Sequence, residues 1–495
     1  MHSERVRLLT PAAEPADTLL VGAVMAIMIW APLPLASNRT WAVGVLLLMV
    51  CVMWLTVVMT YRRYAGWLVE RLRAYCVPLF LLFGIVCYTA LQSIPFPLAL
   101  IKMLSPEAAQ LWQGVDPTAT QGTVSLDPAQ TQLMAALAFV YASMFTFVII
   151  VLRTQQRLVW FVYALIASGV FQALLGGFLL SIHAQYEVAT VALVHDITSG
   201  IVGTFVNRNH FAGYMEMCLA LGIGMMVAQL HGVSSKGQHR FVVSVLEFIL
   251  SPAMCLRLML VVMVVALVLT RSRMGNAGFF AAMLLAGVVY IVLARRATRM
   301  MMLLLISLII IDVWVIGKWV GLDKVAQRLE ATPLTIMAAA QPDRQHKGLG
   351  REQSLEERTL PAEFALGILR DFPLTGTGAG TFYTTFPRYR LMGIPYYYDH
   401  AHNDYLELLT EYGLPASTLF ALFLALTLVQ IARTLRHHRL PLARGIGFGV
   451  LMAMLALLIH STVDFNLQIP ANALTFTVIM ALVWVAARID KKTEY

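Results

Sequence analysis

Long apolar runs recur along nearly the whole chain, and they constrain its fold more than any other feature. Each run is about as long as a helix that crosses the hydrocarbon core of a bilayer, roughly 20 residues. The runs lie near residues 18–36, 41–60, 76–94, 131–152, 158–182, 209–230, 256–270, 275–294, 301–321, 413–432, 444–462 and 471–487. Only 13% of the residues are charged and 59% are hydrophobic, which excludes an ordinary water-soluble domain. The sequence therefore predicts an all-α polytopic membrane protein with about twelve transmembrane helices.

The spacing of these runs divides the chain into three parts. Residues 1–321 hold the first nine predicted transmembrane helices, with short loops between them, and residues 413–495 hold the last three. Residues 322–412 form a long hydrophilic segment, and loops of this length often carry function. Within it, Ser354–Asp371 and the stretch from His402 to Glu411 have the pattern of amphipathic helices. Residues 322–412 are therefore the first place to look for a functional site.

The distribution of arginine and lysine predicts the orientation in the membrane. Short cytoplasmic loops collect basic residues, and with the N-terminus inside, the basic groups fall in the inner loops 61–75, 153–157, 231–256, 295–300 and 433–443. Both termini are then cytoplasmic, and the segments near 95–130, 183–208 and 322–412 face the opposite side. The net charge of +9 follows from this topology, so it predicts no nucleic-acid binding.

Several kinds of site are absent from the sequence pattern. The five cysteines lie in or beside apolar runs without the paired spacing of a metal cage or a disulfide framework, so we expect them to be packing residues. No glycine-rich phosphate loop follows a predicted strand. We therefore expect no ATP-driven activity within this chain.

The most informative polar segment is Tyr398–Leu409, which closes the hydrophilic stretch. His402 is its candidate general base, because neighbouring carboxylates such as Asp404 can orient an imidazole and bring its pKa towards neutrality. Two other interpretations remain open at this point. His400, His402 and Asp404 could ligate a metal ion, or His402 could have a purely structural role.

Arginines at the ends of predicted helices form a second group of candidates. Arginine binds phosphate oxygens bidentately and remains charged at physiological pH, so such residues favour a phosphate or diphosphate ligand. The candidates are Arg208, within Asn207-Arg208-Asn209-His210, then Arg271 and Arg273, and finally Arg388 and Arg390 in the long segment. Each group also has a structural alternative. Arg208 could snorkel to the lipid headgroups, Arg271 and Arg273 could simply lie in an exposed turn, and the arginines of the long segment could be solvated. Asp464, in the polar stretch His460–Pro470, adds an acid to the same predicted side, although a polar hairpin turn is its simpler explanation.

Five motifs together resemble the O-antigen ligase and polymerase superfamily over most of the chain from about residue 130. They are Thr204–Tyr214, Leu269–Gly275, Gly376–Phe382, Ala401–Gly413 and Asp464-Phe-Asn. The resemblance implies a bacterial inner-membrane glycosyltransferase of the GT-C type with a periplasmic active site. Such an enzyme transfers a glycan from undecaprenyl diphosphate, without a nucleotide sugar, a metal ion or another cofactor. In the ligase branch the acceptor is the lipid A core oligosaccharide of lipopolysaccharide.

The resemblance also implies roles for individual residues. The histidine of the family's large loop falls on His402, which would deprotonate the acceptor hydroxyl. The family's arginines fall on Arg208 and Arg273, with Arg271 beside the latter, and would bind the diphosphate. Asn207, Asn209, Tyr214 and Asp464 are supporting candidates from the same motifs, and His400, which directly precedes the fourth motif, is a further supporting candidate. Two hypotheses go beyond the family: Arg388 or Arg390 as a third phosphate contact, and Asp404 as the group that orients His402.

The branch within the superfamily stays open at the level of sequence. Ligases, repeat-unit polymerases and protein O-oligosaccharyltransferases share these motifs, and a ligase is the favoured interpretation. A transporter or flippase for lipid-linked glycans could share the basic residues, but it would not need a histidine placed as a base. Transfer of glycan therefore separates the enzyme from the transporter.

Overall fold

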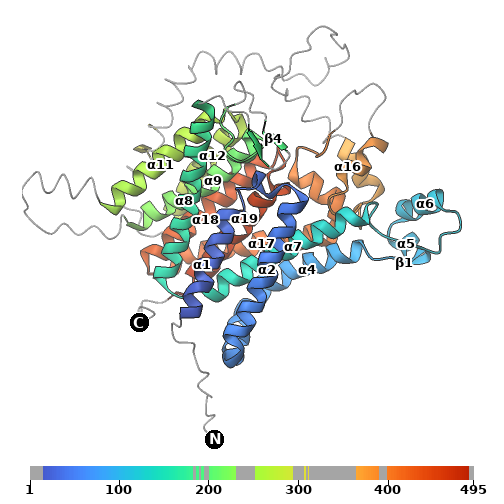
Figure 1. The fold of residues 1–495 in the computed structure, drawn as a ribbon, viewed down its shortest axis with the longest axis horizontal. Helices are drawn as coiled ribbons and strands as arrows, with labels where there is room; N and C mark the ends of the chain where they lie inside the picture. Colours follow the sequence, from blue (N-terminus) through green and yellow to red (C-terminus); the bar gives the residue numbers. More distant parts are fainter. Residues whose placement is uncertain are drawn as a thin grey trace, which may run out of the picture.

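The computed structural model describes residues 15–181, 186–188, 191–193, 200–229, 251–293, 306–307, 310, 364–389 and 398–489. Within them, seven helical stretches are long and apolar enough to cross a membrane, and the shorter helices α1, α4, α11 and α19 are also apolar. The helices are α1 (Pro15–Trp30), α2 (Thr40–Tyr61), α3 (Ala65–Arg73), α4 (Cys76–Gln92), α5 (Leu98–Leu104), α6 (Pro106–Val115), α7 (Pro128–Val151), α8 (Gln155–Ser181), α9 (Arg208–Gln229), α11 (Pro252–Leu269), α12 (Arg273–Leu293), α16 (Phe382–Thr385), α17 (Asp404–His437), α18 (Pro441–His460) and α19 (Pro470–Ala486). The chain is therefore a largely helical, multi-pass membrane protein (Figure 1).

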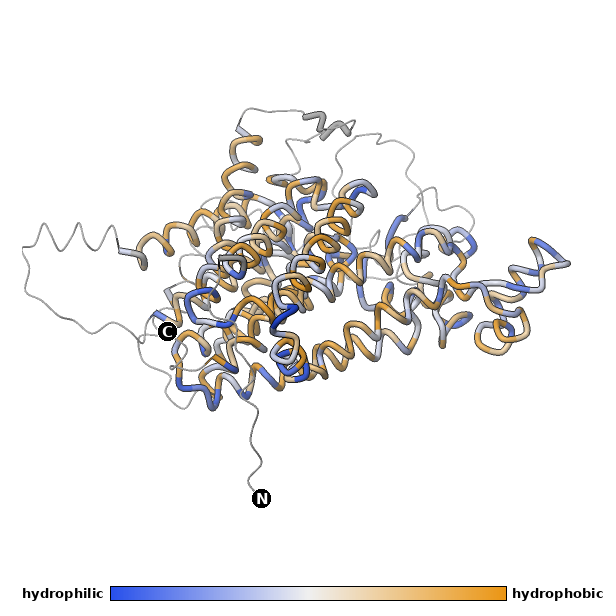
Figure 2. The backbone as a smooth tube through the Cα atoms, turned by 60° about the horizontal axis from the view of Figure 1, so that its bottom comes forward, coloured by the Kyte–Doolittle hydropathy of each residue, from blue (hydrophilic) through white to orange (hydrophobic). Residues whose placement is uncertain are grey.

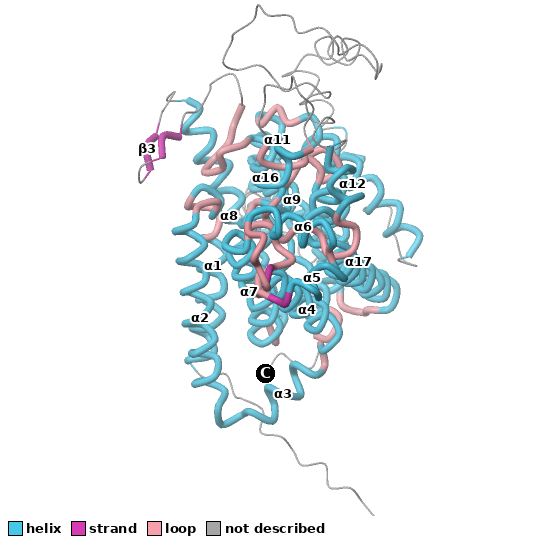
Figure 3. Tube along the Cα trace, turned by 90° about the vertical axis from the view of Figure 1, so that its right-hand side faces the viewer, coloured by secondary structure: helices cyan, strands magenta, loops and turns pink. Residues whose placement is uncertain are grey.

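Short elements connect these helices. Two small antiparallel hairpins pair β1 (Phe96–Pro97) with β2 (Gln121–Gly122), and β3 (Tyr186–Val188) with β4 (Val191–Leu193). Single 3-10 turns are η1 (Leu35–Ser37), η2 (Arg62–Tyr64), η5 (Phe386–Arg388) and η6 (Asn466–Gln468). Figure 3 shows that helix dominates the described chain and that strands are a minor part of it.

The apolar runs predicted most helices well, because a run is bounded by the residues that end a helix. Proline occupies the first turn of α7, α11, α18 and α19, where its missing N–H group costs no helical hydrogen bond. The first helix is shorter than predicted: it ends at Trp30, and Pro32 and Pro34 follow. The predicted run at 301–321 lies outside the described residues, apart from 306–307 and 310.

The centre of the molecule is the pair α9 and α18, with α19 beside them. The apolar stretch of α9 is wholly buried, so this helix is surrounded by the rest of the bundle. Glycines let the two backbones approach: a Cβ atom on Gly224 would lie 2.5 Å from the carbonyl oxygen of Gly445. Large apolar side chains remain exposed on peripheral helices such as α2, including Leu48 and Leu55. Figure 2 shows the long helices as predominantly hydrophobic, as expected for helices that cross a membrane.

A buried ionic cluster ties four helices together at the end of the bundle where α1 and α8 begin. Asp17 of α1 accepts a hydrogen bond from Tyr61 of α2 and pairs with Arg153, just after α7, and with Arg157 of α8. Charges that are buried inside a protein are normally paired with opposite charges. These arginines are therefore structural, and they were not among the predicted phosphate-binding residues.

A second, smaller hydrophobic core lies outside the main bundle. It joins α5 and α6 to the segment around α16 and to Tyr398 and Ala401, and it includes Ile101, Phe372 and Phe386. Figure 1 shows α5, α6 and β1 projecting beside α16 at one side of the molecule. Of the predicted amphipathic helix 354–371, residues 364–371 are described and are helical. We call α5, α6 and residues 364–389 the outer unit.

The glycine-rich turn that precedes α16 is packed against α17. Gly376 has a φ of 67°, and a Cβ atom there would lie 2.3 Å from the carbonyl oxygen of Glu411. The buried carboxylate of Glu411 accepts hydrogen bonds from the N–H groups of Gly380 and Phe382, at 2.9 and 2.8 Å. Gln92 of α4 also donates to the carbonyl oxygens of Thr375 and Glu411. Glycine is thus needed here for a close backbone contact.

Candidate functional site

The first turns of α9, α12 and α17 meet at one end of the bundle. Gly275 of α12 lies against α9, since a Cβ atom there would be 2.6 Å from the Cβ atom of Ala212. The hairpin between α18 and α19 lies against the same part of α9, because a Cβ atom on Gly213 would be 2.4 Å from Oδ1 of Asn466. The N–H group of Asp404 donates to the carbonyl oxygen of Ser461 in this hairpin, at 3.0 Å. The positive ends of three helix dipoles are therefore brought together.

Two of the predicted arginines begin these helices. Arg208 is the first residue of α9 and is partly exposed, and Arg273 is the first residue of α12 and is exposed. Arg271 lies in the preceding turn, is exposed, and has a φ of 56°. Ser272 supports this turn, because its hydroxyl accepts a hydrogen bond from the N–H group of Gly275 at 3.2 Å. Arginine side chains and helix N-termini both favour an anion, so this end of the bundle suits a phosphate group.

His402 lies immediately before α17 and not at its first residue. The helix begins at Asp404 with Asn403 as its N-cap, and the side chain of Asn403 accepts hydrogen bonds from the N–H groups of Tyr405 and Leu406. This agrees with the prediction of a helix that starts near His402, and the difference of two residues arises because the cap residue needs an extended backbone. His402 itself has a φ of 49°, in the left-handed region. Strained backbone of this kind is concentrated at functional sites.

Phe465 is the contact that gathers three histidines. Its ring centroid lies 4.2 Å from that of His400 in a stacked arrangement, and 4.5 Å and 4.9 Å from those of His210 and His402 in edge contacts. Tyr398 also contacts this cluster, with its ring centroid 6.3 Å from that of His402. Sequence reasoning included Phe465 in a motif but gave it no role. The contact spans three separate segments of the chain, so no local pattern could have identified it.

His400 is held by a buried carboxylate. Its Nδ1 atom lies 2.6 Å from Oε1 of Glu407, whose other oxygen accepts a hydrogen bond from the N–H group of Ala401 at 2.8 Å. Burial by itself lowers the pKa of His400, but the charge and hydrogen bond of Glu407 outweigh burial and raise that pKa to about 9. His400 is therefore a cation at neutral pH, next to His402 and to the same ring of Phe465.

We expect Glu407→Gln to remove a pH-dependent part of the stability. Because the pKa of His400 is raised from 6.5 to about 9, the pair stabilises the fold fully below about pH 6.5, and this contribution is lost as the pH rises through about 9. The measurement is the midpoint of thermal unfolding of the purified protein from about pH 6 to 10. The midpoint of the wild type should fall more steeply across this range than that of Glu407→Gln. Parallel curves would contradict the assignment, and Glu70→Gln, on exposed α3, is the control.

A buried polar network lies beneath this cluster. Nδ1 of His460 lies 2.9 Å from Oε1 of Glu216, and both side chains are fully buried. Asp464 lies between the rings of His210 and His460, with carboxylate oxygens 3.5 Å from Nε2 of His210 and 3.9 Å from Nε2 of His460. Sequence reasoning missed Glu216, although it is the only acid within the apolar run 209–230. A carboxyl group inside a membrane helix is by itself a signal of function.

Other predicted residues have structural partners. Asn207 caps α9, since its side-chain oxygen accepts a hydrogen bond from the N–H group of Asn209 at 2.8 Å, and Asn209 is buried. The hydroxyl of Tyr214 lies 2.8 Å from that of Ser168 on α8, within the bundle. Asn207 therefore stabilises the start of α9, and Tyr214 packs this helix against α8. Both contacts help to fix the position of Arg208 at the first residue of α9.

The hydrogen bonds of the Asp404 carboxylate go to the hairpin and not to an imidazole. Its Oδ2 atom accepts from the hydroxyl of Ser461 at 2.6 Å and from the N–H group of Leu467 at 3.0 Å. Asp404 therefore joins α17 to the turn that carries Phe465. The hypothesis that it orients His402 gains no support from these contacts, because orientation of an imidazole by hydrogen bonding requires contact with a ring nitrogen.

The two remaining arginine candidates lie elsewhere. Nη2 of Arg388 is 3.3 Å from Oε2 of Glu107 on α6, and both side chains are substantially exposed. Arg390 lies outside the described residues. Among the residues that the structure describes, no group of three or more His, Cys, Asp or Glu side chains could hold a metal ion. The ligand set of His400, His402 and Asp404 considered above is therefore not formed.

Comparison with known proteins agrees with the motif resemblance. Residues 258–421 match the family model described as O-antigen ligase. No curated protein sequence matched the chain. The matched region runs from α11 through the first half of α17, and it contains Arg271, Arg273, Arg388 and His402.

Proposed function

This chain carries an O-antigen ligase family domain at residues 258–421, and on this premise we propose that the protein is an O-antigen ligase of lipopolysaccharide biosynthesis. It is an inverting glycosyltransferase of the bacterial inner membrane. Its donor is a glycan on undecaprenyl diphosphate, and its acceptor is the lipid A core oligosaccharide. The observation that carries this proposal is that the domain contains both arginines of the α11–α12 turn and His402.

The arginines would hold the diphosphate of the donor. Arg208 and Arg273 begin helices whose N-termini lie together, so side-chain charges and helix dipoles act on the same region. As the glycosidic bond breaks, negative charge grows on the departing undecaprenyl diphosphate. Fixed donors that are already oriented stabilise this charge without reorganisation.

His402 would act as the general base. An acceptor hydroxyl attacks the anomeric carbon, its proton passes to the imidazole of His402, and the bond from that carbon to the diphosphate oxygen breaks. A single displacement of this kind inverts the anomeric centre. The left-handed backbone of His402 and its packing against Phe465 fix the imidazole at the start of α17. His400 adds a positive charge beside it, which would favour binding of an anionic donor.

The proposed topology follows the distribution of basic residues. About twelve helices of GT-C arrangement would cross the membrane, with both termini cytoplasmic. The ends of α9, α12 and α17 described above, together with the outer unit, would then face the periplasm. The lipid carrier and its glycan are accessible on that side, and nucleotide donors are not.

Reconstitution with defined substrates tests the proposal. The purified protein in proteoliposomes is given undecaprenyl-diphosphate glycan with a labelled sugar, and lipid A core as acceptor. We expect the label to move to lipid A core. Elongation of the glycan on its lipid carrier would identify a repeat-unit polymerase, and labelled polypeptide would identify a protein O-oligosaccharyltransferase. Movement of lipid-linked glycan across the membrane without any transfer would overturn the enzymatic proposal in favour of a flippase.

A further inference from the structure

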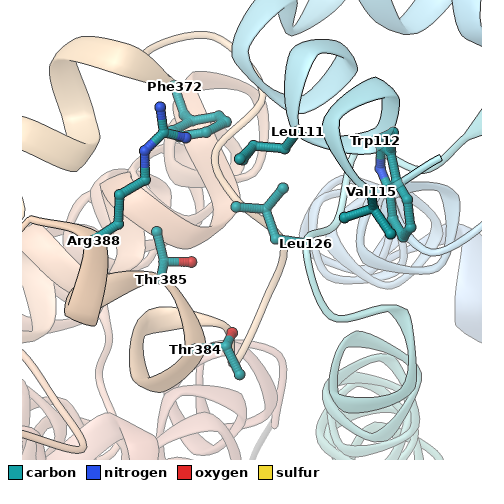
Figure 4. Close-up of a pocket in the computed structure, with 8 residues that line it drawn as sticks. All are labelled: Leu111, Trp112, Val115, Leu126, Phe372, Thr384, Thr385 and Arg388. Atoms are coloured by element: carbon teal, nitrogen blue, oxygen red, sulfur yellow. The ribbon is translucent and has the colours of Figure 1, made fainter. Parts of the chain in front are cut away.

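The outer unit contains a cavity, and of the site residues predicted from the sequence only Arg388 lines it. It has a volume of about 310 Å³ and lies between α6 and the segment 372–388. This volume is at the lower limit of typical small-molecule sites. Figure 4 shows the indole of Trp112 on one wall, with Arg388, Thr384 and Thr385 on the opposite side and apolar side chains between them. The cavity thus combines one aromatic surface with a few polar groups.

Trp112 is a fixed aromatic surface. Its Nε1–H group donates a hydrogen bond to the carbonyl oxygen of Thr123 at 2.9 Å, so the polar edge of the indole is already used. Gly122 of β2 lies against the ring, since a Cβ atom there would be 2.8 Å from Cδ1 of Trp112. The ring is therefore held in one orientation. What it offers to the cavity is apolar π surface.

The polar groups on the opposite wall have unused hydrogen-bonding capacity. The Oγ1 atom of Thr385 is buried and has no hydrogen-bond partner among the described residues, although buried hydroxyl groups are normally paired. The hydroxyl of Thr384 donates to the carbonyl oxygen of Thr381 at 3.0 Å, which leaves its oxygen as an acceptor. Arg388 and Glu107 place a donor and an acceptor side by side at the rim. The cavity therefore presents both donors and acceptors.

We propose that this cavity is a carbohydrate subsite, which receives one sugar ring whose apolar face lies on Trp112 and whose hydroxyl groups bond to Thr384, Thr385 and Arg388. A sugar ring has an apolar face and a periphery of hydroxyl groups, and each hydroxyl both donates and accepts. A lipid tail would leave Thr385 and Arg388 uncompensated. A phosphate would have to compete with Glu107 for Arg388. This assignment replaces our hypothesis of Arg388 as a third phosphate contact.

The subsite rests on the proposed function and extends it to the recognition of glycan. Aromatic side chains connect the cavity wall to the candidate base: Phe386, which follows Thr385, lies 5.7 Å from Tyr398, and Tyr398 lies 6.3 Å from His402 between ring centroids. A sugar chain with one end at His402 could therefore place another residue in the cavity. The chain could belong to the donor glycan or to the acceptor core.

Binding of free glycans tests the subsite without any need for transfer. The probes are the oligosaccharide released from the lipid-linked donor and, separately, delipidated core oligosaccharide, each titrated against the full-length protein in nanodiscs. We expect Trp112→Ala and Thr385→Val each to weaken binding of one probe by roughly tenfold. The probe that responds identifies the source of the sugar. Controls are Trp41→Ala, at an exposed tryptophan of α2, and Thr118→Val, at an exposed threonine outside the cavity.

Transfer kinetics then separate this proposal from the proposed function. In variants that unfold at the temperature of the wild type, loss of the subsite should raise the KM for the responding substrate and leave kcat nearly unchanged. Unaltered binding of both probes in both variants would overturn the subsite, even if the wild type transfers glycan normally. Conversely, a wild type that binds a probe through Trp112 but transfers nothing would overturn the ligase function and retain the subsite.

Discussion

Replacing His402 with alanine is expected to abolish most glycan transfer while undecaprenyl-diphosphate glycan still binds. General-base catalysis is worth roughly 10²- to 10⁴-fold in rate, and the loss should appear in kcat. The imidazole is partly exposed and lies before the first turn of α17, so its removal should leave the helix and its Asn403 cap intact. The measurement is the initial rate of label transfer to lipid A core, together with binding of labelled donor.

The matched control is His437→Ala, an exposed histidine at the other end of α17, which should retain the rate of the wild type. A His402→Ala protein that folds, binds donor and transfers glycan within about threefold of the wild-type rate would exclude His402 as the base. His400→Ala in the same assay identifies the base among the two neighbours. Since Glu407 keeps His400 protonated, the neutral imidazole that a base requires is not available there near pH 7.

Replacing Arg208 or Arg273 with alanine is expected to impair use of the donor, and not of the acceptor. Each change removes a charged group that would contact the diphosphate, and loss of one such contact costs roughly 10²- to 10³-fold in kcat/KM. Lysine at either position should restore part of this loss, because it keeps the charge but not the bidentate geometry. The measurements are kcat/KM for donor and for acceptor, and the affinity for undecaprenyl diphosphate itself.

The control for this prediction is Arg39→Ala, an exposed arginine just before α2. It removes the same charge from a short turn between two helices and should leave donor affinity unchanged. Normal donor affinity in both Arg208→Ala and Arg273→Ala would contradict the diphosphate site. Loss in Arg273→Ala alone would restrict the site to the α11–α12 turn.

Much of the helical architecture was predictable because it depends on local composition. Apolar runs, prolines and caps determine where helices such as α7 and α18 begin, and these features are contiguous in the chain. Gly413, with Pro415 after it, is likewise a local signal for a break between the stretch from His402 to Glu411 and the next apolar run. The structure agrees: α17 has a non-helical backbone at Gly413, with a φ of 62°.

The partners within the site could not be predicted, because they depend on packing between distant segments. Asp404 was close enough in sequence to be expected beside His402, but the hairpin at Ser461 and Leu467 binds its carboxylate instead. Glu407, in the first turn of α17, lies inside the polar segment Tyr398–Leu409 but was given no role, and it is the residue that holds a histidine. Sequence motifs therefore indicated which segments matter and left the pairing within them to be determined by the fold.

The carboxylate of Glu411 has a consequence for the size of the glycan that the proposed enzyme would use. By binding the N–H groups of Gly380 and Phe382, it fastens the segment that leads into α16 to the same helix that His402 precedes. The wall that carries Thr384 and Thr385 and the imidazole of His402 are thus both attached to α17. In the proposed subsite, this common attachment would set the separation of the two places, and a sugar chain would need a minimum number of residues to occupy both at once.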